Sequence, residues 1–139
     1  MMTPAKFKLW REHQVLLAVV NGSWNQQTAE KFSLEFMKTA TPLLQAPWAH
    51  IVYLDQWELG VPEIEPVIQQ LIDWSVRHNL RFAAQVYCPH MVKKYQLERM
   101  TTLKSPLFEK RTYPTQQAAF DWLAEEGFRV EQQTFKKLA

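Results

Sequence analysis

The sequence predicts an α/β fold: one domain over residues 1–139, with a mostly parallel sheet of about five strands and about four helices. Strand-like segments alternate with segments of helical periodicity in the order ββαβαβαβα. This alternation requires parallel pairing through right-handed crossovers. The first two strand-like segments are almost contiguous, which favours an N-terminal antiparallel hairpin. A content of 47% hydrophobic and 22% charged residues is ordinary for a globular domain.

The N-terminal third contains the hairpin and a first helix. Residues 6–11 alternate polar and apolar side chains, as a half-buried strand does, and residues 14–20 form a denser β-prone run. Glu12–His13 between them suits a tight turn. Asn25 is a good N-cap for a helix that begins at the next residue. Pro42 should end or kink that helix.

The rest of the chain repeats a strand–helix pattern three times. The expected elements are a strand over 50–55, a helix over 67–78, a strand over 81–87, a helix over 91–100, a strand over 106–113 and a helix over 116–126. The strand over 106–113 is polar, which places it at a sheet edge. Thr115 and Gly127 are good start and stop residues for the last helix. The tail from about residue 128 lacks clear periodicity, so we expect a short extra helix or a frayed end.

Composition excludes several classes of function. The net charge is +2 with both signs mixed along the chain, whereas a nucleic-acid-binding surface needs a basic stripe. The longest apolar run, Val15–Val20, is far shorter than the ~20 residues of a membrane span. The single cysteine, Cys88, excludes an intramolecular disulfide and is typical of a reducing compartment. We therefore expect a soluble cytoplasmic protein with no integral membrane segment and no nucleic-acid partner.

The residues around the first helix and the third strand form a recognisable pattern. A glycine ends the second strand, a capping residue and a Thr-Ala pair open the helix, and the third strand ends in an aspartate. The residues in question are Gly22, Asn25, Thr28, Ala29, Phe32 and Asp55. With the order of elements, this pattern resembles the STAS (SpoIIAA-like) family of anti-sigma-factor-antagonist domains. The resemblance covers residues 6–127 and implies a SpoIIAA-like fold with a binding or regulatory role.

The phosphorylation switch of that family does not carry over to this chain. Phospho-switch members have a serine or threonine at the start of the second helix, where a phosphate lies beside the helix N-terminus. No Ser or Thr occurs here between Asp55 and Ser75, and Ser75 falls on the apolar face inside the expected helix. The resemblance therefore implies a divergent module without a phospho-switch, in a branch that includes lipid-binding-like and uncharacterised members.

The candidate site follows from the rule that open α/β sheets bind ligands at the carboxyl ends of their strands. That rule selects the loops after the second, third and fourth strands. Their candidate ligand- or partner-binding residues are Trp24, Asp55, Trp57, Glu58, Cys88 and His90. Aromatic side chains with a few polar groups are typical of a small-molecule pocket, so the occupant is a small apolar ligand or a protein partner. The alternative is that Asp55 caps a turn, Trp57 packs on a helix and the loop only connects.

Catalytic and cofactor chemistry is weakly supported. Cys88-Pro89-His90 could form a thiol–histidine pair at a helix N-terminus, which leaves a small thiol-dependent enzyme as the alternative function. The four histidines show no metal-ligand spacing, and three glycines provide no phosphate-binding loop, so we expect no metal and no cofactor. The basic stretch around Lys93 is interpreted as a solvated helix face. A homodimer formed through the aromatic surface is a third interpretation.

Overall fold

The computed structural model describes residues 6–88, 93–101 and 105–131 and has the predicted α/β architecture. Its elements are β1 (Phe7–Glu12), β2 (Val15–Val20), α1 (Gln26–Ala40), a 3₁₀ turn η1 (Thr41–Leu43), β3 (Trp48–Tyr53), α2 (Ile64–Arg77), β4 (Leu80–Val86), α3 (Lys93–Thr101), β5 (Glu109–Tyr113) and α4 (Gln116–Glu125). Among the described residues, no helix is long and apolar enough to cross a membrane.

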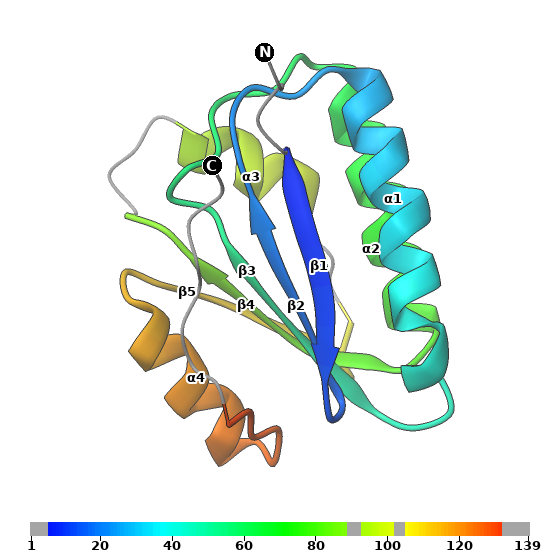
Figure 1. Cartoon of the computed structure of the whole chain (residues 1–139), viewed down its shortest axis with the longest axis vertical. Helices are drawn as coiled ribbons and strands as arrows, with labels where there is room; N and C mark the ends of the chain where they lie inside the picture. The colour runs from blue at the N-terminus through cyan, green and yellow to red at the C-terminus, as the bar shows by residue number, and fades with distance from the viewer. Residues whose placement is uncertain (1–5, 89–92, 102–104, 132–139) are drawn as a thin grey trace.

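The five strands form one sheet in the order β1-β2-β3-β4-β5. β1 runs antiparallel to β2, and the other neighbours are parallel, as the sequence predicts. β5 lies at the edge, where its polar side chains are tolerated. Helices α1, α2 and α3 cover one face of the sheet and α4 covers the other (Figure 1). The molecule is therefore a three-layer sandwich with one apolar core on each side of the sheet.

Local signals account for most helix ends. Asn25 caps α1, since its Oδ1 accepts the backbone N–H of Thr28 at 2.9 Å. Thr115 caps α4 in the same way, through Ala118 N at 3.2 Å. Asn79 follows α2 with a φ of 79°, a left-handed conformation that asparagine adopts more readily than most residues. Asn25 and Thr115 therefore set the starts of α1 and α4 through bonds within one turn, whereas Asn79 also donates to the distant Leu44 O at 2.7 Å.

Several boundaries differ from the sequence expectation; β5, for example, begins at Glu109 instead of residue 106. The hairpin turn is His13–Gln14 and not Glu12–His13, because Glu12 still pairs with Val15. Helix α2 begins at Ile64 instead of Val67, because Pro66 lies in its first turn, where the missing N–H has no intrahelical acceptor to lose. β3 ends at Tyr53, so Asp55 follows the strand after one residue and belongs to the loop.

Candidate functional site

The loops at the carboxyl ends of β2 and β3 are tied together by backbone hydrogen bonds. Gly22 N donates to Gln56 O at 2.9 Å, and Glu58 N donates back to Gly22 O at 2.9 Å. Val61 N donates to Trp24 O at 3.1 Å one step further on. Together they make a short parallel bridge that continues the sheet beyond the strand ends. Backbone hydrogen bonds therefore hold the loops after β2 and β3 against each other.

Both predicted site tryptophans are core residues. Trp24 and Trp57 are 4% and 3% exposed. The indole Nε1 of Trp24 donates to Asn21 O at 3.0 Å, which satisfies its polar atom. The ring of Trp24 lies 5.0 Å from that of Phe32, in the apolar layer beneath α1. Neither indole is available to a partner on the outer surface, although both line an internal cavity.

The two predicted carboxylates hold loops in place. Asp55 Oδ1 accepts the backbone N–H of Cys88 at 3.2 Å, which joins the ends of β3 and β4. Burial raises the pKa of Tyr53, and the neighbouring Asp55 carboxylate raises it further. Glu58 is exposed and accepts a hydrogen bond from the Ser23 hydroxyl at 2.9 Å. Cys88 is half-buried, and His90 lies outside the described residues.

Lys93 contradicts its interpretation as part of a solvated helix face, because it is only 6% exposed. Its Nζ donates to the carbonyls of Leu54 and Trp57, the latter at 2.7 Å. Burial lowers the pKa of Lys93, and the charges of Asp55 and Glu58 partly oppose that shift. Leu54 O also accepts the backbone N–H of Trp57 at 3.0 Å, and the buried ammonium supplies a further donor to Leu54 O and one to Trp57 O.

Helix α3 braces the same loop at two further points. The Gln96 side chain pairs with the backbone of Gly60, accepting from its N–H and donating to its C=O, each at 2.9 Å. Arg99 Nε and Nη2 each lie 3.2 Å from the Glu65 carboxylate. That contact lowers the pKa of Glu65. The loop between β3 and α2 (residues 54–63), called the acidic loop below, is therefore held to helix α3 by side-chain hydrogen bonds.

A cavity of about 100 Å³ lies beneath this loop, between the sheet and helices α1, α2 and α3. Its wall is mainly apolar and includes Trp24, Leu54 and Trp57 at the carboxyl end of the strands. The half-buried residues of the lining are His50, Ile72, Phe108 and Lys110. The sequence predicts a binding site formed by the loops after the second, third and fourth strands. The cavity instead lies beneath these loops, between the sheet and the helices.

Ala83 lines the cavity from a row of the sheet that it shares with longer side chains. Leu16, His50, Ala83 and Lys110 are aligned neighbours across β2, β3, β4 and β5. Ala83 carries a single methyl group between two long side chains, and the helices above do not fill the gap. The row is therefore apolar in the middle and polar at His50 and Lys110.

His50 is a neutral imidazole with a defined tautomer. Burial lowers its pKa from 6.5 to about 4, while its hydrogen bond to Leu16 opposes the shift. Nδ1 lies 2.9 Å from Leu16 O, and a carbonyl only accepts, so Nδ1 carries the hydrogen. The ring packs edge-on against Phe36, with centroids 5.0 Å apart. It is surrounded by protein yet keeps accessible surface, which therefore faces the cavity.

Three further polar side chains line the same space. Lys110 Nζ donates to Thr101 Oγ1 at 2.9 Å, and the Thr101 hydroxyl donates to Leu97 O. Burial lowers the pKa of Lys110, which the Glu98 charge partly opposes. Gln85 is 6% exposed and lies one row further along β4. Sequence reasoning treated His50 only as a metal-ligand candidate and overlooked Gln85 and Lys110. The available signal was that His50 alternates in phase with buried Trp48 and Val52.

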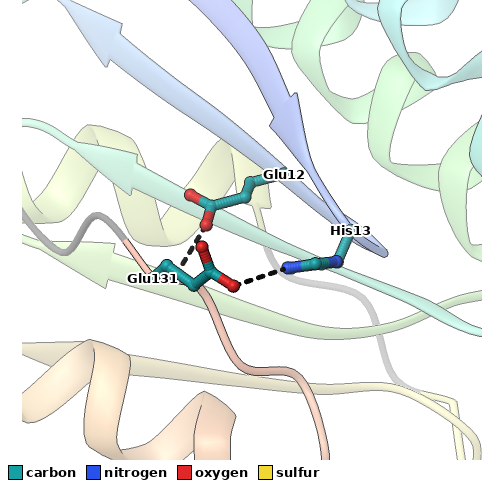
Figure 2. A group of neighbouring side chains, drawn as sticks. All are labelled: Glu12, His13 and Glu131. Atoms are coloured by element: carbon teal, nitrogen blue, oxygen red, sulfur yellow. Dashed lines mark hydrogen bonds and ion pairs between the residues drawn. The ribbon is translucent and has the colours of Figure 1, made fainter.

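A second group of chemically active side chains lies on the α4 side of the molecule. Figure 2 shows Glu12 and His13 of the hairpin pointing toward Glu131. Their ligand atoms lie within 4.8 Å of one another. His13 Nε2 is 3.8 Å from a Glu131 carboxylate oxygen, with side chains 63% and 84% exposed, and Glu131 N donates to Glu12 at 2.6 Å. Such exposed groups form weak ion pairs, and this one ties residue 131 to the hairpin.

The fold is shared with a solved structure. An uncharacterised protein of the DUF3478 family with a SpoIIAA-like fold, from Shewanella loihica PV-4, superposes with a TM-score of 0.63. The match covers 84% of this chain and 91% of that protein at 12% sequence identity, so it shows the SpoIIAA-like fold alone. No protein-family model matches the chain, and no curated protein matches it.

Proposed function

We propose that this chain is a non-enzymatic SpoIIAA-like binding module that takes a small apolar ligand into the cavity beneath the loops after β3 and β4. The observation that carries the proposal is the 100 Å³ cavity with mainly apolar walls. Natural cores leave few voids larger than a water molecule, because an unfilled space forfeits packing contacts. A space of this size in a core otherwise built from tryptophan and phenylalanine supports a binding role.

The volume limits the size of the ligand. A cavity of about 150 Å³ lined by apolar side chains binds benzene and stays dry otherwise. A space of 100 Å³ suits a ligand of a few carbons. A single ring fits if it extends toward the half-buried Ile72, Phe108 and Lys110. We expect the module to act in the cytoplasm, as the single cysteine suggests.

Regulation by phosphorylation at the start of α2 is not part of the proposal. Glu63 occupies the N-cap position of α2 and makes no side-chain cap, and the first turn contains Glu65. Ser75 is 1% exposed and donates to Leu71 O at 2.8 Å. Glu63 and Glu65 already give the start of α2 a negative charge. A partner would therefore recognise this region by its shape and apolar contacts and not by a phosphate.

A protein partner is the second candidate, and exposed apolar residues on the acidic loop support it. Leu59 is 48% exposed and Val61 is 42% exposed, on either side of the Gly60 that α3 holds. Apolar side chains on a braced loop are pre-organised for association. The same surface is the candidate for a homodimer, which light scattering over a concentration series would detect.

Filling the cavity tests the ligand proposal. Ala83→Val adds two methyl groups between His50 and Lys110 in the wall of the cavity. The substitution should leave the circular dichroism spectrum unchanged. Toluene is the probe, and binding is followed by tryptophan fluorescence, because Trp24 and Trp57 line the cavity. We expect toluene to change the fluorescence of the wild type and not of Ala83→Val. An equal response in both proteins would place the bound toluene elsewhere and refute the proposed site.

A thiol-dependent activity is the alternative from the sequence, with Cys88 as the nucleophile. Cys88 is half-buried at the carboxyl end of β4, and its backbone N–H donates to Asp55 Oδ1 at 3.2 Å. Alkylation of Cys88 as a function of pH discriminates. An activated thiol reacts fast well below pH 8, and a slow reaction that accelerates only above about pH 8.5 argues for the binding module.

A further inference from the structure

The imidazole of His50 gives the apolar cavity one defined hydrogen-bonding preference. Because Nδ1 carries the hydrogen and donates it to Leu16 O at 2.9 Å, Nε2 on the other side of the neutral ring carries a lone pair. Among the residues that the structure describes, no donor lies within hydrogen-bond distance of Nε2. The accessible part of this otherwise enclosed ring faces the cavity. A ligand that donates a hydrogen bond would satisfy it.

The other polar groups of the cavity contribute donors. Lys110 Nζ uses one N–H for Thr101 Oγ1 at 2.9 Å and retains others. The buried amide of Gln85 also carries two N–H groups and lines the cavity. The Ser75 and Thr101 hydroxyl hydrogens are already given to backbone carbonyls. The cavity thus offers acceptors at His50 Nε2 and at the Gln85 amide oxygen, and donors at Lys110 and the Gln85 NH₂ group, around an apolar space.

We propose that the ligand is a small uncharged alcohol or phenol whose hydroxyl donates to His50 Nε2 and accepts from Lys110 or Gln85. This inference rests on the proposed function, and it names the ligand class of the same cavity. A hydroxyl is the smallest group that donates and accepts at one atom, so it fits a cavity whose polar groups include both acceptors and donors. The remainder of the molecule packs against the aromatic and aliphatic wall.

Other ligand classes fit less well. A carboxylate could pair with the Lys110 ammonium, but it has no hydrogen for Nε2 and would place a negative charge beside that lone pair. An ammonium would face Lys110. A plain hydrocarbon of equal shape would leave Nε2 without a partner, which a buried acceptor tolerates poorly.

The experiment compares phenol with toluene, which have nearly the same shape and differ in the hydroxyl. Each is titrated into wild type, His50→Phe and His50→Gln, with backbone NMR shifts of cavity residues as the readout. We expect the ratio of phenol to toluene affinity to fall about three- to tenfold in His50→Phe, the range of one hydrogen bond. His50→Gln retains an acceptor oxygen and should restore most of the preference.

The outcomes separate the two proposals. If neither probe shifts the cavity resonances of the wild type, the proposed function fails and the inference fails with it. If both bind and the ratio is the same in His50→Phe, the cavity binds ligands but the hydroxyl preference is refuted. Should a variant not fold, the ¹⁵N shift of His50 Nε2 in the wild type decides. Phenol should move it and toluene should not, and equal responses would overturn the inference.

Discussion

Acidification should destabilise this protein through His50 well before its carboxylates are protonated. Burial lowers the pKa of His50 in the folded protein from the ordinary value of 6.5 to about 4. Between these two pH values His50 is protonated in the unfolded state and neutral in the folded state, so the free energy of unfolding decreases as the pH falls. The stabilisation is fully present above pH 6.5 and is lost progressively toward pH 4.

The size of the effect follows from the shift. Each pKa unit corresponds to about 1.4 kcal/mol, so the complete loss is about 3.4 kcal/mol for a shift from 6.5 to about 4. Only part of it falls in an accessible window: between pH 7 and pH 5 the free energy of unfolding should drop by about 1.8 kcal/mol. With a urea m-value of about 1.5–2 kcal/mol/M, the unfolding midpoint should move by about 1 M.

Urea denaturation followed by circular dichroism at pH 7, 6 and 5 measures this drop. His50→Phe is the matched control, because phenylalanine keeps an aromatic ring in the cavity wall and cannot titrate. The variant should show little pH dependence over the same window. If wild type and variant lose the same stability between pH 7 and pH 5, His50 is not the group responsible and its burial is misjudged.

Three further predictions concern the braced loop and the first helix, all measured by urea unfolding. Trp57→Ala should cost about 3–5 kcal/mol because it empties a core position, while Glu58→Ala beside it should cost under about 0.5 kcal/mol; similar small losses in both would mean that Trp57 is not core. Lys93→Met removes the ammonium's hydrogen bonds to Leu54 O and Trp57 O and should cost about 1–3 kcal/mol, against little for Lys94→Met, and equal costs would show that Lys93 does not stabilise the loop. Asn25→Ala should cost about 1 kcal/mol and Asn25→Ser almost nothing, whereas a neutral Asn25→Ala would show that the cap contributes no stability.

The sequence predicts those parts of the fold that depend on neighbouring residues. Asn25 and Thr115 cap helices through bonds three residues away, and alternation identifies the strands. The polar character of residues 106–113 places β5 correctly at the edge. Each of these signals is written within one turn of helix or one strand, so it can be read without knowing the tertiary structure.

The site depends on residues far apart in the sequence, so it was predicted less well. Trp57 was correctly assigned to the end of β3, but the helix that buries it comes from another part of the chain. Lys93 reads as a surface lysine, because the two carbonyls that hold it lie 39 and 36 residues earlier. The cavity over Ala83 depends on how the strands align with helices α1, α2 and α3. A pattern of neighbouring residues in the sequence cannot predict that alignment.

The strand order has a consequence for how the chain folds. Every pair of adjacent strands in the sheet is consecutive along the chain, so no strand has to be inserted between two that are already paired. Each step closes a loop no longer than one crossover, which keeps the entropy of closure small. A nascent chain leaving the ribosome could add one strand at a time to the open edge. On this route β5 and α4 arrive last, and the α4-side core closes only when the other is already assembled.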